Sequence, residues 1–211
     1  MQRSTVFEET YQKYLEEIRN SDYLSKGTLL GAEISGNALE IRLYDRLYRV
    51  GDGGIEDCAG NPVPPAVRVI LCKYVLMCPV ELPRVTDQLM TYREFRNAGP
   101  LISYFTTNTN KIIETTFSGR RDALQERCRQ LGGILRDDQS YDLSVEFSAL
   151  PRIPVIVNFN DRDDLFPATC SILYKASAEI YLDMECLAMS GTLLAGKLIS
   201  PEHREQQVSM R

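Results

Sequence analysis

The residues best suited to chemistry lie in the stretch NFNDRDDLFPATCSILY, residues 158–174. Asp161, Asp163 and Asp164 place three carboxylates within four residues, and hard cations such as Mg²⁺ or Ca²⁺ prefer several carboxylate oxygens from one loop. The spacing allows a metal site, although it lacks the alternating ligands, the glycine and the distal glutamate of a calcium loop. The alternative is a turn between two strands, in which the aspartates accept hydrogen bonds from nearby backbone N–H groups.

A second candidate is an anion site at the segment SGRR, residues 118–121. This segment opens a predicted helix, so free backbone N–H groups and the guanidinium groups of Arg120 and Arg121 could hold a phosphate or a carboxylate. Three more arginines, at positions 127, 129 and 136, add local positive charge. The alternative is a solvated helix face that Asp122 and Glu126 partly neutralise.

Cysteine and histidine chemistry has less support. The six cysteines (58, 72, 78, 128, 170 and 186) include no CxxC pair, whereas zinc and iron–sulfur sites use closely spaced ligands. We interpret them as small buried hydrophobic residues, and only Cys58 has a loop position that justifies a test for a thiolate. The single histidine, His203, lies in a polar C-terminal segment, which argues against His-based triads and metal sites. These patterns assign no cofactor.

Hydrophobic periodicity predicts the elements that must position these residues. Apolar residues at helical spacing predict helices over 5–20, over 66–78 after Pro65, within 101–117, from a Ser118 cap to Gly132, and over 184–199 after an Asp183 cap. Alternation and turn residues predict strands over 32–34 and 39–43 with turns at 35–37 and 51–54. Three more strands follow in residues 141–174, and the uniformly apolar one, 153–159, should be central.

Strands that come in groups, and do not alternate with helices, predict an α+β fold with a mixed or antiparallel sheet. We expect a single domain over residues 1–200 and a polar tail over 201–211. A net charge of −5 argues against nucleic-acid binding, and the longest near-apolar run, residues 66–80, is too short and too charged to span a membrane. Because the first 20 residues contain no apolar stretch of signal-peptide type, we expect a cytoplasmic protein.

The C-terminal segment LPRIPVIVNFNDRDDLFPATCSILYKASAEIYLDMECLAMSGTLLAG resembles an uncharacterised bacterial and archaeal family that is found mainly in anaerobes. The shared pattern is a proline-led apolar strand, an acidic turn ending in acidic-Phe-Pro, a strand into Ser-Ala, and an acidic-led helix. Leu165 stands where the pattern usually has an acidic residue, so a carboxylate cluster there has one carboxylate fewer. Some relatives look fused to a corrinoid-type iron–sulfur module, and because no cysteine precedes Cys58 we do not expect that module here. The resemblance implies a fold and a metabolic setting but no reaction.

Three functional hypotheses are consistent with these observations. The first is a non-catalytic accessory or small-ligand-binding protein in anaerobic metabolism. The second is an enzyme that acts on an anionic metabolite through the 161–164 turn and the arginines. The third is an assembly subunit whose exposed apolar patch contacts a partner protein. Formation of a homo-oligomer is a further possibility that the sequence leaves open. An apolar cavity would favour the first, a pocket lined by Asp164 and Arg121 the second, and a flat apolar surface the third.

Overall fold

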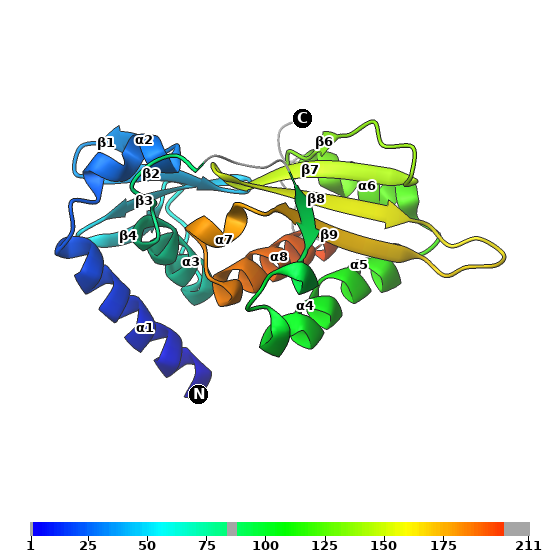
Figure 1. Cartoon of the computed structure of the whole chain (residues 1–211), viewed down its shortest axis with the longest axis horizontal. Helices are drawn as coiled ribbons and strands as arrows, with labels where there is room; N and C mark the ends of the chain where they lie inside the picture. Colours follow the sequence, from blue (N-terminus) through cyan, green and yellow to red (C-terminus); the bar gives the residue numbers. More distant parts are fainter. Residues whose placement is uncertain (1, 84–87, 201–211) are drawn as a thin grey trace.

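A computed structural model describes residues 2–83 and 88–200, with side chains from residue 6 onward. Two antiparallel sheets lie end to end, and α3, α8, α4 and α5 lie along one side of them (Figure 1). The α+β prediction is confirmed. The predicted tail, 201–211, which includes His203, lies outside the described residues.

The first sheet is a four-stranded meander in the order β1-β2-β3-β4. Its strands are β1 (Glu33–Ser35), β2 (Ala38–Leu43), β3 (Arg46–Gly51) and β4 (Gly54–Asp57). The predicted turns at 35–37 and 51–54 are confirmed, and Gly36 (φ 60°) and Gly54 (φ 129°) have the positive φ that glycine tolerates best. A third turn joins β2 to β3 through Tyr44, which has φ 55° without being glycine.

The second sheet has five strands in the order β5-β9-β8-β7-β6. They are β5 (Leu89–Thr91), β6 (Ile134–Leu135), β7 (Leu143–Leu150), β8 (Ile153–Asn160) and β9 (Thr169–Lys175). The strand predicted to be central, β8, is the middle strand, and six of its eight residues are buried. The acidic stretch 161–168 joins β8 to β9 as a long hairpin loop.

Three long helices form the layer beneath the sheets. They are α1 (Gln2–Arg19), α3 (Pro65–Leu76) and α8 (Met184–Ile199). α3 was predicted over 66–78; it starts one residue earlier, at Pro65, ends at Leu76, and is buried between α1 and α8. Asp183 caps α8, because its side chain accepts a hydrogen bond from the backbone N–H of Cys186 (2.9 Å). The cap prediction and both ends of the last helix are confirmed.

Shorter helices complete the layer. The region predicted to be helical, 101–117, forms α4 (Ile102–Asn108) and α5 (Asn110–Phe117), with a break at Thr109, and α6 (Arg121–Gln130) follows. One-turn helices are α2 (Gly27–Leu30), α7 (Ala178–Tyr181), η1 (Leu24–Lys26), η2 (Tyr92–Glu94) and η3 (Gly99–Leu101). No helix in the described part of the chain is long and apolar enough to cross a membrane.

A single hydrophobic core runs from Tyr11 to Leu198 and joins the two sheets. The tip of the β2–β3 hairpin contacts the second sheet directly, since the backbone N–H of Tyr44 donates to the carbonyl of Ala149 at the end of β7 (2.9 Å). The two sheets therefore act as one body over which the helices pack.

Candidate functional site

The two sites predicted from the sequence meet at the N-terminus of α6. The loop after β8 brings the Asp161 carboxylate there from 40 residues further along the chain. One carboxylate oxygen accepts hydrogen bonds from the N–H groups of Gly119 (2.5 Å) and Arg162 (2.7 Å), and the other accepts from Arg121 N–H (3.1 Å). The N–H of Arg121, the first residue of this helix, and that of Gly119, just before the N-cap, therefore already bind an anion supplied by the same chain.

The environment of Asp161 keeps its carboxylate ionised. Partial burial alone raises the pKa of Asp161, but the three backbone hydrogen bonds outweigh it, so the net pKa is lowered. The prediction that Ser118 caps this helix is wrong, because Arg120 is the N-cap residue and makes no side-chain capping bond. Asp161 takes over that role from another part of the sequence.

The two arginines of the predicted anion site bind groups of the protein itself. The Arg120 guanidinium donates to the carbonyl of Thr116. The Arg121 guanidinium donates to the carbonyl of Asp142 (2.9 Å) and to the Asp122 carboxylate (3.0 Å). Anion binding by Arg120 and Arg121 stays a prediction, and an incoming anion would compete with Asp161 for the helix N-terminus.

The remaining basic residues near α6 also have partners. Arg129 pairs with Glu126 (2.8 Å) and Arg136 pairs with Glu146 (2.9 Å) on the surface. Arg127 reaches the last turn of α8, where it donates to three backbone carbonyls, those of Lys197, Leu198 and Ser200. The arginine cluster thus contributes helix capping and surface ion pairs.

The other two aspartates of the acidic stretch differ from each other. One oxygen of Asp163 accepts from the N–H groups of Leu165 and Phe166 (2.7 Å each), and these bonds lower the pKa of Asp163. Asp164 is exposed. Within the described residues, no group of three or more His, Cys, Asp or Glu side chains is arranged to hold a metal ion. Metal binding by Asp161, Asp163 and Asp164 stays a prediction, while the turn bonds expected of Asp163 are present.

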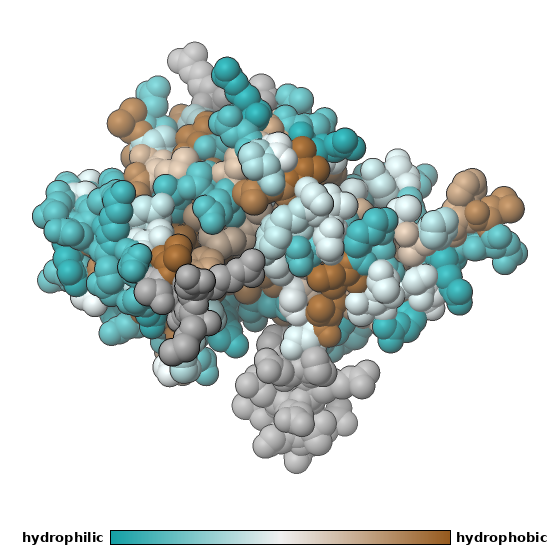
Figure 2. Space-filling model, turned by 90° about the horizontal axis from the view of Figure 1, so that it is seen from below, coloured by the Kyte–Doolittle hydropathy of each residue, from teal (hydrophilic) through white to brown (hydrophobic). Residues whose placement is uncertain are grey.

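The same loop exposes two large apolar side chains at its tip. Leu165 is 82% exposed and Phe166 is 69% exposed. The loop projects from the end of the second sheet, and its brown tip stands clear of the body at the right of Figure 2. The backbone bonds to Asp161 and Asp163 hold this loop in one conformation.

A groove of about 1110 Å³ lies on the helical side of the molecule, where Figure 2 shows apolar surface between hydrophilic regions. Its floor is the outward face of α8, with Met189, Thr192, Leu193 and Gly196. These residues follow one another at spacings of three, one and three, as expected for one helix face. Arg121 and Asp164 are not among the residues that line this groove.

Two other helical regions form the walls of the groove. α1 contributes Phe7, Thr10 and Tyr14 on one side, and Leu101 and Tyr104, in and after η3, lie on the other side. α3 closes the bottom beside α8 through Ala66 and Val69. The walls and the floor are mostly apolar, so the groove can remove apolar surface of a ligand from water.

The two ends of the groove carry different charges. At the N-terminal end of α8, the Lys73 ammonium pairs with Asp183 (3.1 Å) and lies 4.7 Å from the centre of the Tyr14 ring. Burial lowers the pKa of Lys73, but hydrogen bonds to Tyr14 and Asp183 outweigh it, so Lys73 stays protonated. The exposed carboxylate of Glu185 adds negative charge at this end.

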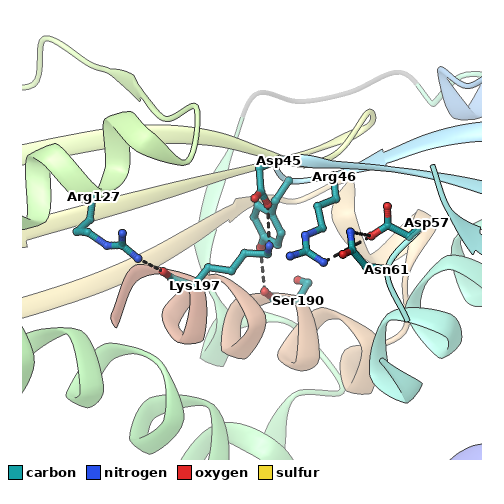
Figure 3. Close-up of polar contacts among 8 residues, drawn as sticks. Asp45, Arg46, Asp57, Asn61, Arg127, Ser190 and Lys197 are labelled. Atoms are coloured by element: carbon teal, nitrogen blue, oxygen red, sulfur yellow. Dashed lines mark hydrogen bonds and ion pairs between the residues drawn. The ribbon is translucent and has the colours of Figure 1, made fainter. Parts of the chain in front are cut away.

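At the C-terminal end of α8 the charge is positive. Lys197 lines the groove and pairs with Asp45 in the β2–β3 turn (2.7 Å). Figure 3 shows Lys197 extending from α8 toward Asp45, with Arg127 at the end of the same helix. The positive charges of Lys197 and Arg127 also offset the partial negative charge at the C-terminus of α8.

The floor helix is braced from the sheet side by tyrosine hydroxyls. Tyr92 donates to the carbonyl of Met184 (2.7 Å) and Tyr44 donates to the carbonyl of Ser190 (2.8 Å), and both tyrosines are buried. Burial raises the pKa of Tyr92 to about 12, so its hydroxyl stays neutral and keeps its proton to donate. Tyr44 adopts a left-handed backbone conformation that is unusual for a residue other than glycine, and its hydroxyl binds α8 from the sheet side.

The cysteines give no sign of an activated thiol. Cys72, Cys128, Cys170 and Cys186 are buried, as predicted, and burial raises the pKa of the Cys72 and Cys128 thiols to about 12. Cys58 is exposed, but desolvation first and the nearby Glu40 second raise its pKa above the ordinary value. The environment of Cys58 disfavours the thiolate for which we singled it out.

Comparison with known proteins places the chain in a family. Residues 24–197 match the family model described as "Domain of unknown function (DUF3786)". Because this match covers most of the chain, the protein belongs to that family. Searches of curated proteins and of solved structures find no significant match.

Proposed function

We propose that this protein is a non-catalytic binding protein that holds an elongated apolar ligand in the groove between α1, α4 and α8. The observation that carries the proposal is the groove itself, about 1110 Å³ of largely apolar space on a floor formed by the 16-residue helix α8. Its volume lies just above the usual range for small-molecule sites, roughly 300–1,000 Å³. The setting in anaerobic metabolism and in the cytoplasm remains part of this proposal, on the basis of the sequence.

The chemistry of the groove supports binding more than catalysis. Two of the three charged side chains that line it are engaged in ion pairs, Asp183 with Lys73 and Lys197 with Asp45. The cysteine in its lining, Cys186, has a pKa raised by burial. Catalytic groups instead have a pKa close to the working pH.

Gly196 offers a clean way to test this proposal. It lies on the floor of the groove, and a Cβ atom added to it would meet no atom within 4 Å. Gly196→Trp therefore places an indole in the groove without an initial clash at Cβ, and tryptophan has a better helix propensity than glycine. Ala123→Trp is the matched control, since Ala123 is exposed on α6 and does not line the groove.

The measurement is a titration with Nile red, a neutral dye that fluoresces when it leaves water. We expect saturable binding of about one dye per chain to the native protein and to Ala123→Trp, and at least tenfold weaker binding to Gly196→Trp. Equal binding to the two tryptophan variants would place the dye elsewhere and refute the proposal. Native mass spectrometry of the purified protein then reports any ligand that it retains.

A second candidate function is assembly with another protein through the β8–β9 loop. It is supported by the exposure of Leu165 and Phe166 on a loop that backbone hydrogen bonds already order, so little entropy is lost on binding. The double variant Leu165→Ser/Phe166→Ser should keep the unfolding temperature. If the native chain self-associates in sedimentation velocity and the double variant does so equally, the loop is not the contact.

A further inference from the structure

The charge distribution along the groove suggests which class of ligand it takes. Lys197 lies at one end, and Asp183 and Glu185 lie at the other. Fourteen residues of helix separate Asp183 from Lys197, which is about 21 Å at 1.5 Å per residue. The space between the two ends is lined by apolar and small residues, among them Met189 and Leu193.

We propose that the ligand is an unbranched alkyl chain of about 16 carbons with an anionic head group that binds Lys197. This inference rests on the proposed function, because it names the ligand of the same groove. An extended alkyl chain advances by roughly 1.25 Å per carbon, since its C–C bonds of about 1.5 Å run in a zigzag. A chain of about 16 carbons therefore spans the distance between the charged ends.

Lys197 can accept a second anionic partner. Its ammonium group has three N–H donors, and the Asp45 carboxylate accounts for one ion pair at 2.7 Å. The Lys197 side chain lines the groove and is 17% exposed, so a head group at this end of the groove lies beside it. Arg127, held against the last carbonyls of α8, adds positive charge behind it.

The opposite end of the groove fixes the orientation of the ligand. A carboxylate head placed there would face the carboxylates of Asp183 and Glu185, and only Asp183 has a cation, Lys73, against it. Like charges at short range disfavour that arrangement. The anionic head therefore lies at Lys197, and the tail runs along α8 toward the start of the helix.

The small floor residues make room for a chain that lies along the helix. Ala188, Thr192 and Gly196 follow one another at four-residue spacing and line the groove. Beside them Met189, an adaptable side chain, can follow the shape of a flexible tail. A groove open along its length also suits a long flexible chain better than a compact ring system, which would leave much of the trough unfilled.

The test is displacement of Nile red by straight-chain carboxylates of 8 to 20 carbons, each below its micellar concentration. Affinity should rise about two- to fourfold per added methylene, as expected for partial to full burial of each CH₂, and should level off near 16 carbons. The alcohol and the amine of equal length should bind at least fivefold more weakly than the carboxylate. Lys197→Met should remove the preference for the acid over the alcohol, and Lys197→Arg should keep it.

Each outcome separates the two proposals. Dye binding that depends on Gly196, without a chain-length trend or with equal affinity for acid and alcohol, overturns the alkyl-anion inference and leaves the binding function standing. Dye affinity that is the same in Gly196→Trp as in the native protein overturns the binding function itself. Because Lys197→Met also breaks the pair with Asp45, its unfolding temperature is measured alongside, and the comparison of acid with alcohol in the native protein decides the question if that variant fails to fold.

Discussion

Replacing Asp161 tests whether the acidic stretch serves to cap α6. The Asp161 carboxylate accepts from the first N–H of this helix, that of Arg121, and from the N–H groups of Gly119 and Arg162. Losing a side-chain cap costs about 0.5–2 kcal/mol, and hydrogen bonds to a charged group lie at the high end of the usual range. We therefore expect Asp161→Ala to lower the free energy of unfolding by about 2 kcal/mol, or the unfolding temperature by about 4–8 °C.

Urea and thermal denaturation measure this loss, with Asp164→Ala as the control. Asp164 is exposed in the same loop, so its replacement should change stability by less than about 0.5 kcal/mol. Formate should partly restore the stability of Asp161→Ala, because it can supply the missing carboxylate to the free N–H groups. Equal losses from the two variants would refute the assignment of the cap to Asp161.

The pH dependence follows from the lowered pKa of Asp161. A carboxyl group whose pKa is lower in the folded state stabilises the fold above its unfolded-state pKa, near 3.8. The stability difference between the native protein and Asp161→Ala should therefore be constant above about pH 5 and shrink as the pH falls below 3.8. A difference that grows in acid would contradict the hydrogen bonds seen here.

Three further variants and reagents test other parts of the structure. Gly119→Ala should destabilise the protein by about 1–2 kcal/mol in urea, since Gly119 has φ 72° and a Cβ there would lie 2.9 Å from the Arg162 side chain. Asp183→Ala should cost about 1 kcal/mol through loss of the α8 cap, and circular dichroism should show less helix at intermediate urea. Cys58 should react with iodoacetamide at pH 7.5 more slowly than a free cysteine in spite of its exposure, because desolvation and Glu40 raise its pKa, and the rate should climb above pH 9.

The parts of the fold that sequence reasoning found are those fixed by local chemistry. The last helix was predictable because Asp183 is a strong N-cap and the apolar face that follows has helical period. The central strand β8 was predictable because burial on both sides leaves an uninterrupted apolar run. In contrast, β5 is only three residues long and is a strand because it pairs with β9, which no local pattern reveals.

The candidate sites were harder to judge, because their partners are distant in sequence. The segment SGRR looks like an open anion site, and only the fold shows that the Asp161 carboxylate occupies it. The groove gave no sequence signal of its own. The apolar stripe of α1 was visible, including Phe7 and Tyr14, but periodicity cannot tell which apolar residues stay uncovered when three helices meet.

The contacts around α8 fix the position of the helix that forms the groove floor. Behind the floor, Phe105 and Tyr174 pack so closely against Gly191 that a Cβ there would lie 2.6 and 2.7 Å from them. The hydroxyls of Tyr92 and Tyr44 bind carbonyls of the same helix, and Asp183 fixes its start. These contacts come from the sheets, from Phe105 of α4 and from the helix end, and none of these residues lines the groove except Asp183 at its end. Because α8 is already fixed, little binding free energy is lost in ordering it. More of the free energy gained by burying apolar surface of the ligand therefore contributes to affinity.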